Sequence, residues 1–542
     1  MLGQMMQMPL LISQQIAFAE RFHGSVEVIT RTVEGPVVRS TWGEVAQRSR
    51  KAAAALVAAG VKPGDRVATI GWNTQRHLEL YFAVSGMGAV LHTINPRLPL
   101  EQLRYVVDHA EDSVLFFDTT FTRLAQFVAS QGLPVRRYIA LTDAANLPDV
   151  ALPGLTDYES FIAAHTDGFE WPSFDENTAS SLCYTSGTAG NPKGVLYSHR
   201  STVLHSYAVS MADSLSISAA DVTLPVVPMF HVNAWGVPYA AAMTGSKLVL
   251  PGPGLDGVSL LALIDSEQVT SLLGVPTVWL GLLNHLRSVG RTLTSVRKVT
   301  IGGSACPPSM IEAFEKEHGA RVLHAWGMTE TSPLGTANLL LPKHAGLDDA
   351  AKLAIKAKQG RPLFGVDLRL VDDAGAIVPH DGATSGHLQI RGPWVASGYF
   401  RRDVDETHVD GWFATGDIAT LDADGYLQLT DRSKDVIKSG GEWVSSIDVE
   451  NAALGHPDVA QAAAIGLAHP KWQERPLLIV VRRPGAAVTE PEILAFLSTK
   501  LVKWWLPDAV VFIDALPLGA TGKVLKRELR ERFAGFVFPD PG

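Results

Sequence analysis

The feature that most constrains the fold is a long alternation of short apolar runs and helix-like stretches between about residues 40 and 430. Residues 67–70, Val-Ala-Thr-Ile, form one such β-branched run, and a helical pattern follows at 77–85. Strands that alternate with helices form parallel sheets covered by helices, so the sequence predicts an α/β fold. Further strands are predicted at 113–118, 182–185, 247–250, 298–301 and 322–325.

The pattern changes after about residue 434, where a second and smaller α/β domain is predicted. This part contains a predicted helix at 447–454, strands at 462–467 and 477–481, and a helix that begins at Thr489. Thr489 and Glu492 fit a capping box. The polar segment 430–442 contains the double glycine Gly440-Gly441 and could carry a hinge. We therefore expect a large domain over 1–433 and a small, mobile domain over 434–542.

Composition excludes several classes of protein. The 542 residues carry a formal net charge of -9, which argues against a general nucleic-acid binder, because phosphate neutralisation needs a basic surface. The two cysteines, Cys183 and Cys306, have no CxxC spacing, so neither a disulfide framework nor a zinc site is predicted. Without a basic leader or a long apolar run, a soluble cytoplasmic protein with no integral membrane segment is expected. Residues 9–22 predict an amphipathic helix, and packing on the protein's own body or on a second subunit is favoured over the alternative of peripheral membrane contact.

The segment 184–194, Tyr-Thr-Ser-Gly-Thr-Ala-Gly-Asn-Pro-Lys-Gly, is the most informative motif. Its glycines let backbone N–H groups approach an anion, its hydroxyls donate hydrogen bonds or hold a metal, and Lys193 supplies charge. It is not a Walker A loop, since Lys193 follows Pro192 and is not followed by Ser or Thr. Loops of this composition are often plain surface turns, but this spacing of hydroxyls and lysine favours a phosphate site.

This motif resembles the signature loop of the adenylate-forming superfamily, which includes acyl-CoA synthetases, nonribosomal-peptide adenylation domains and firefly-type luciferases. The resemblance covers essentially the whole chain and is strongest to bacterial medium- and long-chain fatty-acyl-CoA synthetases. Ala189 stands where the family usually has a second threonine, which removes one hydroxyl near the phosphates. The matching segments continue in order at 229–235, 302–305, 325–330, 391–392, 398–399, 415–417, 431–435, 438–443 and 521–523.

The resemblance implies a nucleotide site in which Trp326 lies at the adenine, Asp417 and Arg432 hold the ribose, and Thr185 with Glu330 holds Mg²⁺. From the residues alone, Trp326 would equally be a core side chain, and Asp417 or Arg432 a surface charge. Hydroxyl and carboxylate oxygens do suit Mg²⁺. The full implied set for ATP and AMP is Thr185, Ser186, Gly187, Thr188, Ala189, Gly190, Lys193, Gly303, Ser304, Ala325, Trp326, Gly327, Met328, Thr329, Glu330, Asp417, Arg432, Lys434, Lys438 and Trp443.

For the acid, the resemblance places His231 beside the reacting carboxylate, with Val232 and with Trp235 at the mouth of an acyl tunnel. A solitary histidine in an apolar run is otherwise usually a satisfied core residue. In the small domain, Lys523 would enter the site, where an ammonium neutralises charge developing at the α-phosphate.

The linker also receives roles from the resemblance. Lys434 would be the hinge residue, and Lys438 would be a further catalytic lysine that meets the nucleotide from the linker side, together with Trp443. Gly440 and Gly441 would border the pantetheine path of coenzyme A, since residues without Cβ let a narrow chain pass close to the backbone.

The sequence thus predicts a ligase that converts a fatty, medium- to long-chain acid to acyl-AMP and then to acyl-CoA, with ATP, Mg²⁺ and coenzyme A. A homodimer is implied by the resemblance only. Three alternatives stay open at this stage: a CoA ligase for a short-chain, thioether or aryl acid; an acyl-AMP ligase that delivers to a carrier protein; and an inactive adenylate-binding regulator. The presence of Lys193, Glu330, Asp417 and Lys523 argues against the regulator.

Overall fold

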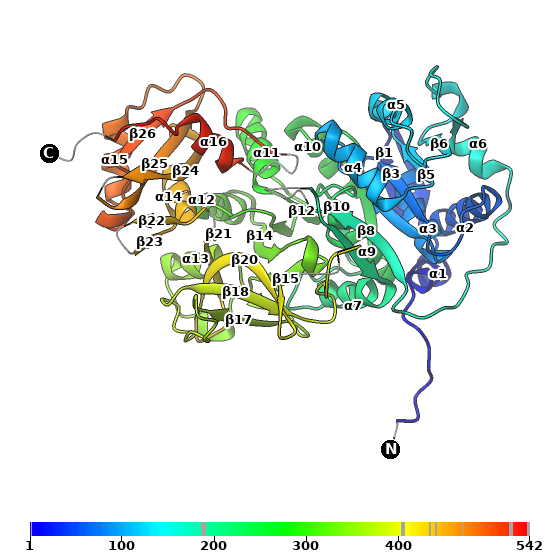
Figure 1. The fold of residues 1–542 in the computed structure, drawn as a ribbon, viewed down its shortest axis with the longest axis horizontal. Coiled ribbons are helices and arrows are strands. Elements are labelled where there is room, and N and C mark those ends of the chain that lie inside the picture. The colour runs from blue at the N-terminus through cyan, green and yellow to red at the C-terminus, as the bar shows by residue number, and fades with distance from the viewer. Residues whose placement is uncertain are drawn as a thin grey trace.

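The structure is a computed structural model that describes residues 1, 3–185, 191–402, 407–432, 435–439, 442–469, 471–519 and 524–538, without the side chains of Glu442 and Trp443. Within these residues the strands form four sheets, three in a large domain and one in a small C-terminal domain. The small domain lies at the left of Figure 1, in orange and red, beside the body of the large domain. The α/β architecture with a large and a small domain is therefore confirmed.

The first sheet of the large domain has the strand order β7-β6-β5-β3-β4-β8-β9, and all neighbours pair parallel except β8 and β9. The antiparallel pair β8 and β9 is joined through residues 185–193, so the glycine-rich motif connects two adjacent strands. The strand bounds are β3 Arg66–Ile70, β4 Val90–Thr93, β5 Val114–Phe117, β6 Arg137–Ala140, β7 Thr156–Asp157, β8 Ala179–Tyr184 and β9 Gly194–Ser198.

The second sheet has the order β16-β15-β14-β13-β12-β10-β11-β1-β2 and is parallel from β1 through β14. Its parallel centre brings the carboxyl ends of β13 and β14 to the same edge, which is where ligands bind in such sheets. The bounds are β1 Glu27–Arg31, β2 Val37–Thr41, β10 Val222–Pro225, β11 Lys247–Leu250, β12 Ser271–Gly274, β13 Lys298–Ile301, β14 Arg321–Gly327, β15 Leu334–Ala337 and β16 Arg361–Pro362.

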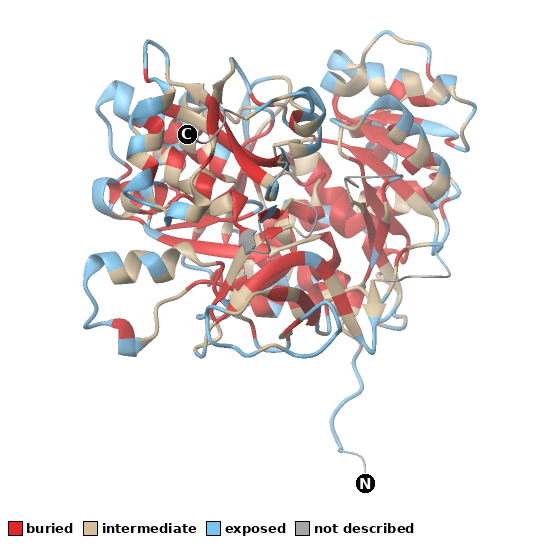
Figure 2. Cartoon of the chain, turned by 60° about the vertical axis from the view of Figure 1, so that its left-hand side comes forward, coloured by how far each residue is buried: buried red, intermediate tan, exposed pale blue. Residues whose placement is uncertain are grey.

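Helices cover these two sheets, and the burial colours of Figure 2 show the strands as the buried centre of the molecule. The predicted N-terminal helix forms as α1, and Ile12, Ile16 and Ala19 on its inner face are fully buried, so it packs on the protein's own body. The helices of the large domain are α1 Ile12–His23, α2 Trp42–Ala58, α3 Gln75–Gly86, α4 Leu100–Ala110, α5 Thr122–Ser130, α6 Tyr158–Ala163, α7 His199–Ser210, α8 Val232–Trp235, α9 Val237–Thr244, α10 Gly257–Glu267, α11 Pro276–Val289, α12 Pro308–Glu312 and α13 Asp349–Ala357.

The third sheet differs from the parallel arrangement predicted for this part of the chain. It is an antiparallel sheet of the order β17-β18-β20-β19, with β21 paired to β20. Short hairpins explain the difference, because turns such as Asp410-Gly411 reverse the chain without room for a crossover helix. The bounds are β17 Asp367–Val371, β18 Gly386–Arg391, β19 His408–Val409, β20 Trp412–Leu421 and β21 Leu427–Arg432.

The small domain is built on the long antiparallel pair β24 and β25, with α14 and α16 packed against β24. The predicted cap of α15 is present, since Thr489 N donates to Glu492 Oε2 at 2.8 Å. The bounds are β22 Ile437–Ser439, β23 Glu442–Val444, α14 Ser446–Leu454, β24 Val459–His469, β25 Gln473–Arg482, α15 Glu490–Ser498, β26 Ala509–Phe512 and α16 Lys526–Arg532.

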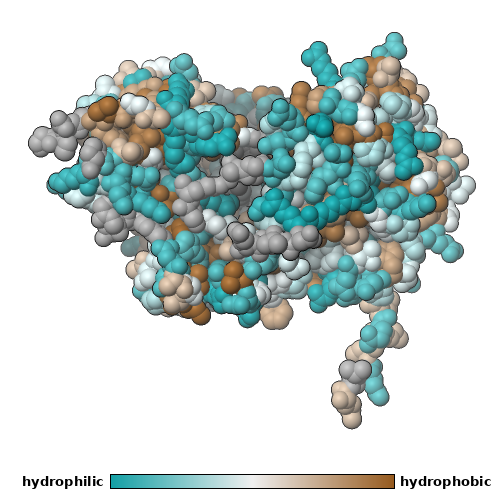
Figure 3. Space-filling model, viewed as in Figure 1, coloured by the Kyte–Doolittle hydropathy of each residue, from teal (hydrophilic) through white to brown (hydrophobic). Residues whose placement is uncertain are grey.

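Helix length and surface hydropathy are the features that concern contact with a membrane. In the described residues, no helix combines the length and apolarity needed to cross a bilayer. Hydrophilic residues cover much of the face drawn in Figure 3, with apolar residues in small groups between them.

Candidate active site

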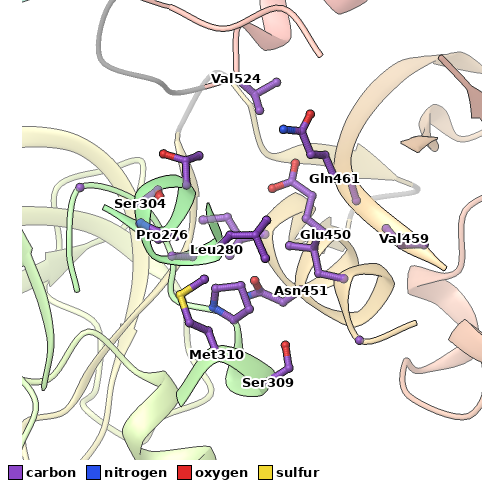
Figure 4. A pocket seen from close by; sticks show the side chains of 18 of the residues that line it. Pro276, Leu280, Ser304, Ser309, Met310, Glu450, Asn451, Val459, Gln461 and Val524 are labelled. Atoms are coloured by element: carbon purple, nitrogen blue, oxygen red, sulfur yellow. The ribbon is translucent and has the colours of Figure 1, made fainter. Parts of the chain in front are cut away.

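A cavity of about 480 Å³ lies between the two domains, and we refer to it as the interdomain cavity. Its volume falls in the range of small-molecule sites. Figure 4 shows Ser304, Leu280 and Met310 of the large domain facing Glu450 and Gln461 of the small domain across it. Both domains therefore contribute walls to one site.

The large-domain wall is formed by the ends of β13 and β14. Gly303 and Ser304 follow β13, while Ala325, Trp326 and Gly327 complete β14, and all five line the interdomain cavity. The Trp326 indole lies against the backbone of β15, because a Cβ on Gly335 would lie 2.6 Å from Trp326 Cζ3. An aromatic face fixed beside small residues is suited to stacking on a planar ring.

Asp417 and Arg432 line the same cavity from two neighbouring strands. They are register partners in β20 and β21, and Arg432 Nε lies 2.9 Å from Asp417 Oδ1. Asp417 is buried, and Arg432 also donates to the carbonyl oxygen of Thr415 at 3.1 Å. The two predicted ribose residues are therefore brought together, with the carboxylate oriented by the guanidinium.

Thr185 and Lys193 close the two ends of the glycine-rich motif. Thr185 N donates to Lys193 O at 2.9 Å, and Lys193 N donates to Thr185 Oγ1 at 3.4 Å. Ser186, Gly187, Thr188, Ala189 and Gly190 lie outside the described residues.

A tyrosine connects this motif to the carboxylate predicted for the metal. Lys193 Nζ lies 4.5 Å from the centre of the Tyr399 ring, and Tyr399 OH donates to Glu330 Oε1 at 2.7 Å. Sequence reasoning gave Tyr399 no role, although Gly398-Tyr399 belonged to the matching segments. Lys193, Tyr399 and Glu330 thus form one contact chain between segments far apart in sequence.

The short turn that carries Thr329 and Glu330 is held rigidly. Tyr197 OH donates to Thr329 O at 2.6 Å, and Ala396 N donates to Glu330 O at 2.7 Å. Burial raises the pKa of Tyr197 well above its ordinary value, so its hydroxyl stays a proton donor. Met328 precedes them, half-buried, and its N–H donates to Thr331 Oγ1 at 2.9 Å.

The donor chemistry of this cluster fits Mg²⁺. Glu330 is buried, and one of its carboxylate oxygens is oriented by Tyr399, near the hydroxyl-bearing motif. Among the described residues, no group of three or more His, Cys, Asp and Glu side chains could hold a metal. Mg²⁺ needs no such cage, since it uses one or two carboxylates, keeps several waters and binds substrate phosphates.

The predicted acyl residues follow β10 in an unusual turn. Val232, Asn233, Ala234 and Trp235 all have positive φ, between 46° and 59°. The Trp235 ring lies against the turn after β13, because a Cβ on Gly302 would lie 3.1 Å from Trp235 Cη2. His231 is half-buried and Val232 is buried at the start of this turn. The predicted acyl residue Trp235 and the cavity wall at Gly303 are therefore neighbours.

A buried histidine contacts the end of the turn formed by residues 232–236, which we call the acyl turn because it carries the predicted acyl residues. A Cβ on Gly236 would lie 2.8 Å from His205 Nδ1, and His205 Nε2 accepts from Leu334 N at 3.2 Å. Burial lowers the pKa of His205 to about 3. This ring is therefore neutral at physiological pH.

Lys523 lies outside the described residues, as do Lys434, Gly440 and Gly441. The residues on either side of the lysine loop, Leu518 and Val524, form a β-bridge and both line the interdomain cavity. Lys438 lies elsewhere: it is exposed in β22, and its N–H donates to Glu474 Oε2 at 2.9 Å.

Asp431 of the large domain and the ion pair of Lys526 with Glu450 within the small domain line the cavity. Asp431 Oδ2 accepts from Ser446 N at 3.0 Å, at the first turn of α14. Lys526 Nζ lies 2.7 Å from Glu450 Oε1. Burial acts to lower the pKa of Lys526, but Glu450 and then Asp431 outweigh it, so this pKa lies above its ordinary value.

Comparisons with known proteins agree with this geometry. The chain matches the AMP-binding enzyme family over residues 17–400 and the AMP-binding enzyme C-terminal domain over residues 448–523. It is 54% identical to a 3-methylmercaptopropionyl-CoA ligase of Ruegeria lacuscaerulensis, over 98% of this chain and 99% of that protein. It is 51% identical to a medium-chain-fatty-acid–CoA ligase of Ectopseudomonas oleovorans, over 99% of this chain and 98% of that protein.

Among solved structures, an anthranilate CoA ligase in complex with anthranoyl-AMP has the same fold. The TM-score is 0.86 at 22% identity, with 97% of this chain and 98% of that chain covered. Sequence, fold and site agree on one conclusion: the chain belongs to the AMP-binding enzyme family, as an acyl-CoA ligase.

Proposed function

We propose that the chain activates an unbranched apolar acid, with the short thioether acid 3-methylmercaptopropionate placed before medium-chain fatty acids. The similarity that supports this order is the 54% identity to the Ruegeria ligase, against 51% to the medium-chain ligase. A methylthio group and an alkyl chain fit the same kind of apolar pocket, because thioether sulfur packs as a soft apolar atom. The sequence-based preference for a fatty acid is thus kept as the second candidate.

AMP-forming CoA ligases use ATP, Mg²⁺ and coenzyme A. In the proposed adenylation step, a carboxylate oxygen of the acid attacks the α-phosphorus of ATP, and the bond to pyrophosphate breaks. Thr185 and Glu330 would hold Mg²⁺, which neutralises phosphate charge when bound. The assignment is supported by the contact chain of Lys193, Tyr399 and Glu330, which gathers a cation, a hydroxyl and a carboxylate near the motif.

The remaining adenylation residues act by binding and orientation. Trp326 would stack on adenine, and Asp417, oriented by Arg432, would accept hydrogen bonds from the ribose hydroxyls. His231 would lie beside the carboxylate of the acid. Lys523 would stabilise charge at the α-phosphate, and this is consistent with Leu518 and Val524 lining the cavity on either side of its loop.

In the proposed thioester step, the deprotonated thiolate of coenzyme A attacks the acyl carbonyl, the bond from the carbonyl carbon to the phosphate oxygen breaks, and AMP leaves with the electron pair. Rotation of the small domain about Lys434 would bring Gly440, Gly441, Lys438 and Trp443 to the site. The exposed position of Lys438 in β22 is consistent with an arrangement set for adenylation. The domain boundary at 433/434 and the homodimer are part of this proposal, and light scattering of the purified protein tests the dimer.

A panel of isosteric acids tests the substrate. 3-Methylmercaptopropionate and pentanoate differ only by sulfur in place of one methylene, so their ratio of kcat/KM reports recognition of the thioether. Octanoate and dodecanoate report chain length, and benzoate reports aryl acids. A thioether ligase is expected to prefer 3-methylmercaptopropionate over both pentanoate and octanoate.

The same panel supports the second candidate if kcat/KM rises with chain length. Each buried methylene contributes about 0.8 kcal/mol, or roughly fourfold. Preference for benzoate would contradict both proposals. The enzyme could instead release pyrophosphate only when the acid is present and yet form no thioester with coenzyme A. That result would favour delivery of the acyl group to a carrier protein.

A further inference from the structure

The turn after His231 is held in a conformation that its own residues disfavour. Left-handed backbone costs about 1–2 kcal/mol for each ordinary L-residue, and asparagine and glycine tolerate it best. A β-branched residue such as Val232 is a clear outlier there. The φ angles are 46° for Val232, 49° for Asn233, 49° for Ala234, 59° for Trp235 and 72° for Gly236. Contacts with the rest of the domain must therefore hold this turn.

Asn233 makes those contacts with its side-chain amide. Asn233 is buried, and its Nδ2 donates to Ser181 Oγ at 2.9 Å. Its Oδ1 accepts from Thr93 Oγ1 at 3.4 Å and from Cys183 Sγ at 3.5 Å. Burial raises the pKa of the Cys183 thiol to about 11, so the sulfur keeps its proton and can donate.

These contacts reach the strand that leads into the glycine-rich motif. Ser181 and Cys183 lie on β8, which ends at Tyr184, next to Thr185. Thr93 lies at the end of β4, where it is the register partner of Cys183. One amide therefore fixes the acyl turn to the two strands that support the proposed phosphate loop.

The other end of the same segment has its own anchor. Met229 N donates to Asn73 Oδ1 at 2.6 Å, and Met229 O accepts from Tyr81 OH at 2.5 Å. His231 lies between this anchor and Asn233, with Trp235 just beyond. Loss of the Asn233 amide would release only the end of the segment that carries Trp235.

We infer that Asn233 is the positioning residue of the acyl site. Its amide holds the left-handed turn that presents His231 and Trp235, and so determines which acids react. The inference rests on the proposed placement of the acid beside His231 and Trp235. No role was assigned to Asn233 from the sequence.

The test uses Asn233→Gly, because glycine adopts positive φ without strain and only the amide is lost. kcat/KM for the preferred acid is expected to fall by about tenfold, the effect of one to two buried hydrogen bonds. The ratio between 3-methylmercaptopropionate and octanoate is expected to change, while the KM for ATP stays near that of the wild type. Amides of residues 233–236 are expected to exchange faster with deuterium, while the amide of Met229, held by Asn73, is expected to keep its protection.

Ser181→Ala removes the acceptor of the Asn233 amide and provides the partner variant. Because both changes remove the hydrogen bond between Asn233 and Ser181, their effects on kcat/KM for the acid are expected to be non-additive in the double variant. Additive effects would contradict a shared contact. Asn338→Ala is the matched control, since this buried asparagine donates to Ile355 O and Lys358 O, both at 2.7 Å, away from the acyl turn.

The outcomes separate the inference from the proposed function. If Asn233→Gly lowers the melting temperature as Asn338→Ala does, with unchanged acid ratios, Asn233 is only structural and the inference is wrong. If Trp235→Ala also leaves the acid profile unchanged, the acid does not lie at this turn, and the proposed placement fails with it. A changed profile in Trp235→Ala but not in Asn233→Gly overturns the inference alone.

Discussion

The Tyr399 hydroxyl donates a hydrogen bond to Glu330 Oε1 at 2.7 Å. The ring of the same residue lies beside Lys193, whose Nζ is 4.5 Å from the ring centre. The tyrosine thus touches both a cation and an anion of the proposed site. Its hydroxyl orients the carboxylate, and its ring stabilises the ammonium through a cation–π contact. Separate substitutions can therefore remove one function and keep the other.

Tyr399→Phe is expected to slow adenylation and to raise the Mg²⁺ concentration needed for half-maximal rate. The ring remains for Lys193, but Glu330 loses a hydrogen bond of the charged type, worth about 1.5–3 kcal/mol. The rate is expected to fall by roughly ten- to a hundredfold. Acid-dependent pyrophosphate release across a Mg²⁺ titration measures both effects. Tyr426→Phe is the control: it removes a tyrosine hydroxyl that donates a hydrogen bond to Leu339 O, and it is expected to behave like the wild type.

Glu330→Gln is expected to abolish adenylation while the fold survives. The amide has the shape of the carboxylate but no charge to hold Mg²⁺, so a loss of about two to three decades is expected, as for other transition-state groups. Thermal melting reports the fold, and pyrophosphate release reports the step. A variant with the wild-type rate throughout a Mg²⁺ titration would remove Glu330 from the metal site.

Trp235→Ala is expected to change the chain-length profile more than the affinity for ATP. Removal of the indole from the Gly302 turn enlarges an apolar space, and each methylene that gains or loses contact changes binding by about 0.8 kcal/mol. kcat/KM over a series of acids measures the profile. If all acids lost activity by one common factor while the KM for ATP rose, Trp235 would belong to the nucleotide site.

Lys523→Ala and Gly441→Leu are expected to separate the half-reactions. Loss of a positioned ammonium should cost about 3–4 kcal/mol in adenylation, yet supplied acyl-AMP and coenzyme A should still give thioester. Gly441→Leu should show the reverse, because a branched side chain obstructs the pantetheine path, so acyl-AMP accumulates. Single-turnover assays of each step decide the matter. Equal slowing of both steps in both variants would rule out the rotating small domain.

His205→Asn is expected to make stability less sensitive to acid. The pKa of His205 is about 3 in the folded protein, below the ordinary value of about 6.5, so the unfolded chain binds the extra proton between these values. Above pH 7 the His205 ring is neutral in both the folded and the unfolded chain, so it does not affect stability. Below pH 6.5 only the unfolded chain binds the proton, and the free energy of unfolding falls by about 1.4 kcal/mol per pH unit. Denaturant unfolding at pH 7 and pH 5 measures this difference. Identical pH dependence in both proteins would contradict the buried neutral state.

The sequence predicts most of the large domain because parallel strands are buried on both faces and read as apolar runs. The predicted strands at 247–250 and 298–301 coincide with β11 and β13. The antiparallel third sheet was missed, although Asp410-Gly411 and Asp424-Gly425 are hairpin signals at its turns. Its strands are short or half-exposed, so their apolar pattern is weak.

The site was predicted less completely than the fold. The glycine-rich motif and Trp326 have distinctive local sequence, and the structure brings Trp326, Asp417 and Arg432 to one cavity. Tyr399 and Asn233 lie in segments that match the family, but their local sequence indicates no role for them, because their importance comes from partners more than fifty positions away, at Glu330 and Ser181. Contacts of that kind depend on the packing of several elements and are not encoded in any short segment.

The carboxylate of Asp431 in the large domain accepts from Ser446 N, in the first turn of α14 of the small domain, just after the N-cap residue Ser445. The first turn of a helix carries partial positive charge, so that turn attracts Asp431 electrostatically as well as by its hydrogen bond. The proposed rotation would separate the pair and cost about 1 kcal/mol, the usual net value of one hydrogen bond. In the proposed scheme, the resting population would therefore be biased toward the arrangement in which ATP and acid react. Coenzyme A, whose binding favours the other arrangement in this scheme, would have to supply that difference, and higher ionic strength would reduce it.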